Sequence, residues 1–261
     1  MTSDDRGTAS TVPDGDDGPR SSRVRNKKRK HLPLWQETIL LLGLALVLAV
    51  GIKALLVQAF YIPSESMEPG LIRNDRILVE KVSYWFGGEP QRGDVVVFKD
   101  PGGWLTESES AGPANPVAKA MAAIGLYPEG GHLVKRVVGV AGDTITCCDD
   151  QGRISVNGEP LDEDAYIKEQ GTPCNGPMVS NCNWEAGPVP EGHVFVMGDN
   201  RGRSADSTVH LCRPDQTDCV PGDEFVPVDL VVGKVFVLLW PADRFDLVGR
   251  PEAFADVPDG S

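Results

Sequence analysis

The longest apolar stretch of the chain lies near its amino-terminal end. The run Ile39–Val57 contains 19 residues and one charged side chain, Lys53. A helix of this length spans roughly 28 Å, close to the hydrocarbon thickness of a bilayer. Lys53 lies near one end, where its long side chain can reach the interface. The pattern predicts one transmembrane helix within residues 35–59. A buried core helix is the alternative, but such helices rarely run this long without a polar face.

The segment before this run, residues 1–34, has no periodic apolar face. Asp, Gly, Ser, Thr and Pro dominate its first part, and it ends in a basic run from Arg20 to Lys30. We expect a disordered tail, because such a composition buries too little surface to offset the entropy lost on ordering. Basic residues favour the cytoplasmic side, which places residues 60–261 outside the cytoplasm. Cleavage after Ala59 stays open as an alternative, but the length of the apolar run favours an uncleaved anchor.

After residue 60 the pattern changes to short β-branched runs bounded by Gly or Pro. The predicted strands are Arg76–Val82, Asp94–Phe98, Leu133–Val140, His193–Met197 and Val231–Leu239. Ile154–Val156 precedes Asn157-Gly158, a pair typical of a type I′ hairpin turn. Residues 115–126 begin with Asn-Pro and predict a short helix within an insertion at 101–131. We therefore expect a mostly β fold: a single transmembrane helix, then an extracytoplasmic domain of coiled antiparallel sheets with a short helical insertion.

Composition narrows the function classes. The chain has 38 acidic and 25 basic residues, so its net charge is −13. This argues against nucleic-acid binding, which needs a basic surface. All six Cys lie in the second half, four of them in a subdomain at about 143–195. An extracytoplasmic location permits disulfides. No Cys-x-x-Cys spacing occurs, so we expect no metal, and nothing in the sequence indicates a cofactor.

The pairing of the Cys is only partly constrained by the sequence. Cys174–Cys182 and Cys212–Cys219 would each close a short loop. The adjacent Cys147 and Cys148 are not expected to bond each other, given normal disulfide geometry. Each of them could instead pair with one of the Cys at 174 and 182, so the connectivity stays open.

Two serines follow the apolar run in a segment stiffened by proline. Ser64 and Ser66 lie between Pro63 and Pro69. In an extended segment they share one face, about 6–7 Å apart. One could act as a nucleophile while the other donates a hydrogen bond. The alternative is a solvated linker, since Ser is common in turns.

A serine nucleophile needs a base, and Lys135 is the first candidate. If Leu133 faces the core, the strand period sends Lys135 inward and Arg136 outward. Burial disfavours the ammonium form of a lysine, and a neutral amine can accept a hydroxyl proton. The alternative is an outward-facing Lys that protects a sheet edge. A Ser/His/Asp site would instead use one of three histidines: His132, His193 or His210.

A third segment, residues 198–207, follows the predicted strand His193–Met197. It is dense in hydrogen-bonding side chains and reads Gly-Asp-Asn-Arg-Gly-Arg-Ser-Ala-Asp-Ser. It is either a surface turn or a loop that holds a catalytic group, with Ser204 placed to hydrogen-bond a lysine amine.

Taken together, the anchor and these segments resemble the bacterial type I signal peptidase family. Residues 64–69 are similar to its nucleophile motif S-x-S-M-x-P, and residues 92–98 to its strand motif R-G-D-[VI]-V-x-F. Residues 135–143 resemble its base motif K-R-[VA]-[VI]-G-x-x-G-D, and residues 198–207 resemble G-D-N-R-x-x-S-x-D-S. The resemblance covers the core of residues 60–261 but neither the tail nor the insertion.

The resemblance implies a Ser/Lys dyad. Ser66 would be the acylating nucleophile and Lys135 the neutral general base, with the Ser66 N–H and the Ser64 hydroxyl as the oxyanion hole. Ser204 would orient the lysine amine. Asp206 and Asp199 would support the loop at 198–207. Arg136 would face away from the dyad, and Met67 would shape the surroundings of the nucleophile.

One position departs from the family pattern. Many members have an Arg two residues after the loop Asp, whereas this chain has Thr208. The missing partner of Asp206 could be replaced by another arginine: Arg201, Arg203 or Arg213.

The resemblance also implies the partners. The substrates would be signal peptides of secretory preproteins, cut after small-x-small motifs and bound along strand 76–82 or the edge at 60–64. The enzyme would be a cell-membrane monomer whose Tyr84-Trp85-Phe86 and Trp240 either contact the bilayer or pack in the core. The alternative function is an inactive single-pass extracytoplasmic β domain that binds a ligand or peptide. A soluble self-cleaving Ser/Lys repressor does not fit the anchor.

Overall fold

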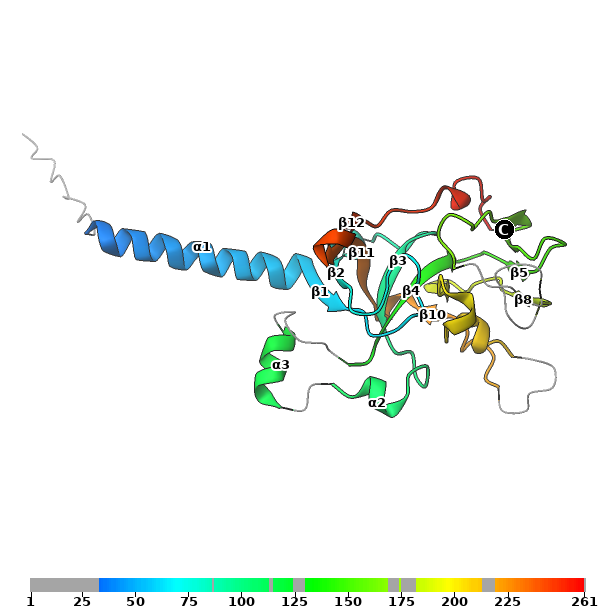
Figure 1. Cartoon of the computed structure of the whole chain (residues 1–261), viewed down its shortest axis with the longest axis horizontal. Coiled ribbons are helices and arrows are strands. Elements are labelled where there is room, and N and C mark those ends of the chain that lie inside the picture. The colour runs from blue at the N-terminus through cyan, green and yellow to red at the C-terminus, as the bar shows by residue number, and fades with distance from the viewer. Residues whose placement is uncertain are drawn as a thin grey trace, which may run out of the picture. The chain divides into compact units, whose positions relative to one another are not determined.

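The computed structural model describes residues 33–85, 87–112, 115–123, 130–168, 174, 182–212 and 219–260. The chain divides into two compact units, Met1–Leu44 and Ala45–Ser261. The described part of the first unit belongs to helix α1 (Leu34–Leu56), drawn in blue in Figure 1. Its large apolar side chains from Leu34 to Val50 are exposed, and Leu34–Gly51 has the length and composition to cross a membrane. Residues 1–32 of the predicted tail lie outside the described residues, and Leu34, its last residue, begins α1.

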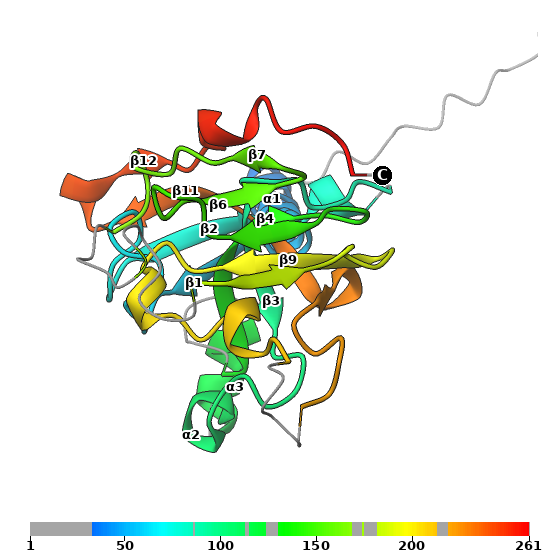
Figure 2. The same cartoon turned by 90° about the vertical axis from the view of Figure 1, so that its right-hand side faces the viewer.

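The second unit contains an eight-stranded antiparallel sheet, which confirms the predicted fold class. Figure 2 shows β4 and β9 of this sheet side by side. The order is β1 (Val57–Tyr61), β2 (Arg76–Glu80), β11 (Val231–Trp240), β3 (Val95–Lys99), β4 (His132–Gly139), β9 (His193–Met197) and β10 (Val226–Pro227), with β12 (Asp246–Leu247) beside β11.

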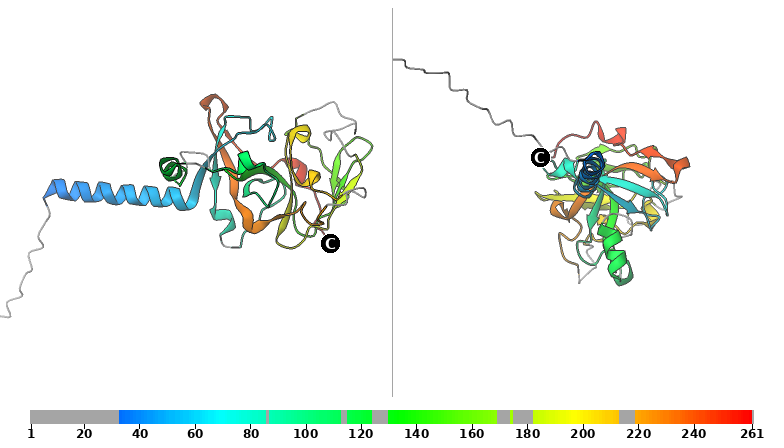
Figure 3. Two further views of the ribbon diagram at one scale, coloured as in Figure 1. Left: turned by 90° about the horizontal axis from the view of Figure 1, so that it is seen from below. Right: turned by 90° about the vertical axis from the view of Figure 1, so that its left-hand side faces the viewer.

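A smaller four-stranded sheet forms a separate group of strands, as Figure 3 shows. Its order is β7 (Glu159–Pro160), β6 (Ile154–Val156), β5 (Ile145–Cys147) and β8 (Trp184–Ala186). Asn157 and Gly158 join β6 to β7 with φ values of 54° and 83°. Positive φ at both central residues is what the predicted type I′ turn requires.

Strand β1 was not predicted. The apolar run was assigned to a helix through residue 59, but α1 ends at Leu56 and β1 starts at Val57. Ala59 pairs with Leu78 of β2 inside this strand. The composition does not change across this boundary, so the pattern could not mark it. β2 in turn ends two residues early, because Val82–Tyr84 forms a 3₁₀ helix.

The insertion contains two helices where one was predicted. Helix α3 (Pro116–Ala123) lies within the predicted segment, whose last residues fall outside the described part. The Asn115 side chain caps it by accepting the Ala118 N–H at 2.6 Å. Helix α2 (Glu107–Ser110) was missed, since a four-residue helix has no periodicity to detect. In Figures 1 and 2 both helices lie below the sheets.

Both faces of the central strands are covered. The side chains of β3 from Val95 to Phe98 are all buried. On β4 both Lys135 and Arg136 are buried, with 4% and 6% of their surface exposed. The expectation that Arg136 points outward is therefore wrong, because it assumed a sheet with one solvated face.

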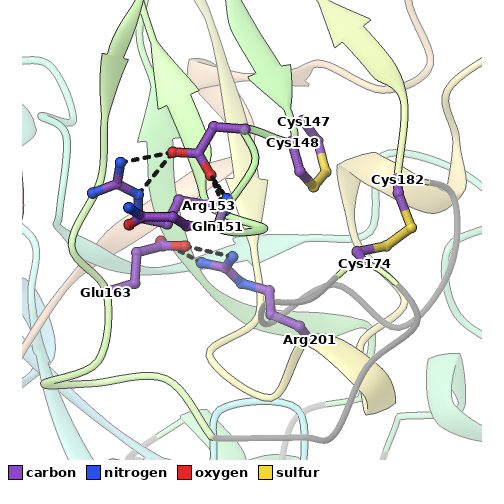
Figure 4. The surroundings of a disulfide bond; sticks show 9 residues. Cys147, Cys148, Gln151, Arg153, Glu163, Cys174, Cys182 and Arg201 are labelled. Carbon is purple, nitrogen blue, oxygen red and sulfur yellow. Dashed lines mark hydrogen bonds and ion pairs between the residues drawn. A yellow bond between two sulfur atoms is a disulfide. The ribbon is translucent and has the colours of Figure 1, made fainter.

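Three disulfides join the six Cys. Cys174–Cys182 and Cys212–Cys219 are the two pairs that proximity suggested. The structure also joins Cys147 to Cys148, with a Cα–Cα distance of 3.0 Å, which contradicts our expectation for adjacent Cys. That expectation assumed a trans peptide, whereas the bond between these two residues is cis. Figure 4 shows this pair close to Cys174 and Cys182.

Candidate active site

The structure brings Ser66 and Lys135 together. The Lys135 Nζ donates a hydrogen bond of 2.8 Å to the Ser66 Oγ, and only 4% of Lys135 and 5% of Ser66 is exposed. Lys135 lies in the middle of β4, opposite Val96 of β3. Ser66 lies in the segment that follows β1. The Ser64 Oγ is 3.2 Å from the Ser66 Oγ, so the two serines share one face as predicted.

The nucleophile segment is held by its own backbone and by one anchor in the core. The Ile62 N–H donates to the Asp75 carbonyl at 2.9 Å, and the Asn74 N–H donates to the Ile62 carbonyl at 2.9 Å. Met67 is 1% exposed and packs against Leu71 and neighbouring core side chains. The residue after Ser66 thus fixes the segment to the sheet.

Both residues of the pair line a cleft of about 780 Å³. One wall is formed by β1 and the residues up to Ser64, another by the first half of β4. β2 is paired on both edges, with β1 and β11, so the suggested route for a peptide along strand 76–82 is wrong. β1 ends the sheet, and its second edge pairs with no described strand.

The loop at 198–207 lies directly behind the nucleophile. Asp206 is 1% exposed and accepts hydrogen bonds from the Gly198 N–H at 2.9 Å and the Thr208 hydroxyl at 2.7 Å. Thr208 therefore partners the carboxylate where the family pattern has an Arg. Arg201 and Arg203 pair with other carboxylates, those of Glu163 and Glu65. Arg213 lies outside the described residues.

Ser204 differs from its implied role in this structure. Its hydroxyl is buried and has no hydrogen-bond partner among the described residues. It lies beside Gly198, where an added Cβ would come within 2.3 Å of the Ser204 Oγ and 2.5 Å of the Ser66 carbonyl oxygen. Gly198 therefore allows the loop and the nucleophile segment to touch.

Arg136 holds the same loop from the other face of β4. Its guanidinium donates to both carboxylate oxygens of Asp199, at 2.8 and 2.7 Å, and to the Gly93 carbonyl at 2.9 Å. It also lies 4.5 Å from the centre of the Tyr166 ring. Burial acts to lower the pKa of Arg136, but Asp199 outweighs burial and the pKa is raised. The arginine stays charged and ties β4 to the loop.

A second buried ion pair was missed by the sequence analysis. Arg201 donates to the two carboxylate oxygens of Glu163 at 2.8 and 2.5 Å, as Figure 4 shows. The Arg201 Nε also donates to the Gly198 carbonyl at 3.1 Å. Tyr166 hydrogen-bonds to Glu163, and burial followed by the charge of Glu163 raises the pKa of this phenol. The segment at 163–166 thus supports the loop behind the nucleophile.

The three candidate histidines do not bond to Ser66, whose hydroxyl contacts Lys135 and Ser64. His132 lines the cleft with its Nδ1 3.2 Å from the Gly130 carbonyl oxygen, and His193 Nδ1 lies 2.9 Å from the Glu191 carbonyl oxygen. His210 stacks on Trp104, and burial lowers its pKa. The geometry favours the lysine as the base.

The chain matches a known family over most of its length. The family model described as signal peptidase, peptidase S26, matches residues 35–240. The chain belongs to this family. It is 39% identical over 242 residues to signal peptidase I of Mycobacterium tuberculosis (strain H37Rv). This alignment covers 88% of this chain and 79% of the relative. It is 33% identical over 236 residues to signal peptidase I of Leptolyngbya laminosa, in an alignment that covers 90% of this chain and 94% of the relative. The chain is therefore a peptidase, a hydrolase of peptide bonds.

The aromatic residues that were considered as membrane contacts divide in two. Tyr84 packs against the core and donates to Asp94 at 3.4 Å, which makes it a core residue. Trp85 and Trp240 are 48% and 56% exposed. Phe86 lies outside the described residues.

Asn200, like Glu163, has a role that the sequence did not reveal. It is fully buried, and its Nδ2 donates to the Glu65 carbonyl at 3.0 Å. The motif marked the residue but not this contact.

Among the described residues, no group of three or more His, Cys, Asp or Glu is arranged to hold a metal ion.

Proposed function

We propose that the chain is a membrane-anchored serine endopeptidase that removes signal peptides from secreted preproteins. It cuts after small-x-small motifs by means of a Ser/Lys dyad. The observation that carries the proposal is the 2.8 Å contact between the Lys135 Nζ and the Ser66 Oγ at the base of the cleft. The names of the relatives, which are signal peptidases I, support the same substrate class.

The chemistry follows from the two groups in contact. The neutral amine of Lys135 accepts the hydroxyl proton as the Ser66 Oγ attacks the carbonyl carbon of the peptide bond. The protonated amine then donates this proton to the leaving amine of the mature protein. Water, deprotonated by the same lysine, hydrolyses the acyl-enzyme and releases the signal peptide. Burial of Lys135 favours the neutral form that the first step needs.

The developing oxyanion is stabilised by the Ser66 N–H and the Ser64 hydroxyl. Ser64 lies on the same face as the nucleophile, 3.2 Å from its Oγ. Donors of this kind contribute about 3–4 kcal/mol each to transition-state stabilisation.

The remaining residues position the dyad. Asp206 and Asp199 hold the loop at 198–207, the first through Gly198 and Thr208 and the second through Arg136. Met67 anchors the nucleophile segment in the core. We assign Ser204, whose hydroxyl is buried without a partner among the described residues, to orient the lysine amine.

The substrate binds as an added strand along the open edge of residues 60–64. Main-chain hydrogen bonds at this edge provide affinity without reading the side chains. The apolar cleft beside the dyad accepts small residues at the first and third positions before the cut. The preproteins that are cut are secretory.

The location follows from the sequence of charges around α1. The basic tail at 1–34 stays in the cytoplasm, residues 35–59 contain the anchor, and residues 60–261 form the extracytoplasmic catalytic domain of a cell-membrane monomer. Ala59 lies within the paired strand β1, which supports an anchor that is not itself cleaved. Trp85 and Trp240 are exposed and available to the bilayer.

The test is cleavage of several model preproteins by the full chain in detergent. Ser66→Ala and Lys135→Ala are compared with two matched controls, Ser155→Ala on β6 and Lys99→Ala on the strand next to β4. We expect cleavage after small-x-small sites that both dyad variants lose and both controls keep. Cleavage by a folded Lys135→Ala variant would contradict the dyad. No cleavage of any preprotein by the unmodified chain would favour an inactive binding domain.

A further inference from the structure

The insertion at 101–131 forms part of the cleft, although no motif of the active site includes it. Its described residues in the cleft lining are uncharged and are either apolar or glycine: Trp104, Leu105, Ala111, Gly112, Ala122, Gly130 and Gly131. They share the cleft with β1 and the nucleophile segment. The insertion therefore adds a wall to the site.

This wall is fixed at its base by Asp100, which follows β3. The Asp100 carboxylate accepts the N–H groups of Gly102, Trp104 and Leu105 at 3.0, 3.1 and 3.4 Å. The Asp100 N–H donates to the Gly131 carbonyl at 3.0 Å. The start and the end of the insertion are thus tied together where β3 ends and β4 begins.

Trp104 fixes the insertion to the core. It is 7% exposed and packs edge-on against Phe98, with 5.9 Å between the ring centroids. Its other contact is a parallel stack on His210 at 4.3 Å and 8°. His210 follows the loop that supports the nucleophile, so the wall and the catalytic loop share a contact.

The wall lies at a defined distance from the dyad. His132 begins β4 and also lines the cleft, and it precedes Lys135 by three residues, roughly 10 Å of extended strand. An extended substrate advances about 3.3 Å per residue. The point at which the insertion joins β4 therefore lies about three residues of extended chain from the dyad.

We propose that the insertion binds the apolar segment of the signal peptide immediately upstream of the small-x-small site. A signal peptide carries an apolar run before its small residues, and that run matches the uncharged lining of the wall. The inference rests on the proposed function, and it makes the insertion a specificity element of that site.

Gly112 gives a clean test. A Cβ added at Gly112 has no described atom within 4 Å, and its φ lies outside the left-handed region, so a side chain there fits without strain. Gly249 has the same properties but does not line the cleft, and it serves as the matched control. Gly112→Asp, Gly112→Leu and the same changes at Gly249 are made in the full chain. Two peptides are compared: a long one with the apolar segment and a short one that begins at the small-x-small motif.

We expect Gly112→Asp to raise KM for the long peptide about tenfold with little change in kcat, because it sets a carboxylate against the apolar side chains of the bound peptide. A lysine in the apolar segment should restore part of this loss. Gly112→Leu should favour long peptides with smaller upstream residues. Cleavage of the short peptide, and both Gly249 variants, should be unaffected.

Two results would overturn the inference while leaving the function intact. One is that kcat and KM for both peptides are unchanged in the Gly112 variants. The other is that kcat/KM falls equally for both peptides. In either case, cleavage of the short peptide by the unmodified chain but not by Ser66→Ala would show that the peptidase function holds. If the unmodified chain cleaves neither peptide, the proposed function fails and the inference fails with it.

Discussion

The backbone N–H of Asn200 donates a hydrogen bond of 2.9 Å to the carbonyl oxygen of Ser66. Its side-chain amide donates to the preceding carbonyl, that of Glu65, at 3.0 Å. The loop at 198–207 therefore fixes two consecutive residues of the nucleophile segment from behind. The position of the Ser66 hydroxyl depends on how closely this loop approaches the nucleophile segment.

The first prediction concerns the close approach at Gly198. Gly198→Ala would place a Cβ 2.5 Å from the Ser66 carbonyl oxygen, a distance that real contacts do not show. The loop and the nucleophile segment must separate, so we expect kcat to fall by at least a factor of about 100, as a displacement of about 1 Å can cause. Peptide cleavage kinetics measure this, with Gly249→Ala as the control. Wild-type kcat in Gly198→Ala would contradict the packing described above.

The second prediction concerns the buried pair of Glu163 and Arg201. Glu163→Gln leaves a buried guanidinium without its counter-charge, which costs about 3–5 kcal/mol of stability. We expect a lower midpoint of thermal unfolding and reduced kcat, because Arg201 also holds the Gly198 carbonyl. Glu159→Gln on the exposed side of β7 is the matched control and should change neither. An unchanged melting temperature in Glu163→Gln would show that the pair does not support the fold.

The third prediction is a pH dependence of stability from Asp94. This carboxylate is 1% exposed; burial alone would raise its pKa, but hydrogen bonds from Arg250 and Lys234 outweigh burial and lower it below the ordinary 3.8. Its stabilising contribution is therefore present above the unfolded-state pKa and is lost as the pH falls through the folded-state pKa.

Asp94→Asn should accordingly lower stability at neutral pH, and the difference from the unmodified chain should shrink as the pH falls below about 4. Denaturant unfolding at a series of pH values measures this. Asp164→Asn, at an exposed position, is the control. A difference that stays constant down to acid pH would rule out a charged, stabilising Asp94.

The fourth prediction is the pH profile of cleavage. The proposed base accepts a proton only when Lys135 is neutral, so kcat/KM should rise as the pH increases from acid to alkaline values. The profile is measured with a peptide that contains no titratable side chain. A rate that is unchanged across this range would contradict the role of the lysine.

The sequence predicts the fold class because strand patterns are local. Short β-branched runs bounded by Gly or Pro mark β3, β4 and β9 to within one residue of their observed ends. Ser66 and Lys135 are 69 residues apart, and their contact could not be derived from spacing. It was implied by the order of the motifs in a resembling family.

The parts that were missed depend on tertiary contacts. Glu163 lies in an acidic segment without periodicity, and its value as a partner of Arg201 exists only after folding. Arg136 is buried because a second layer covers the outer face of β4, which a single strand cannot reveal. The Cys147–Cys148 pair, across a peptide bond that is cis in the structure, has no signal in the sequence.

The most direct test of the dyad is capture of the acyl-enzyme. The full chain is mixed with an activated ester of a peptide that ends in a small-x-small motif, quenched in acid and digested, and the fragment containing Ser66 is weighed by mass spectrometry. We predict a mass increase equal to the acyl group on that fragment, absent in Ser66→Ala and strongly reduced in Lys135→Ala. Turnover of the ester with the acyl group on another residue, or with no acyl group on the chain, would contradict the account.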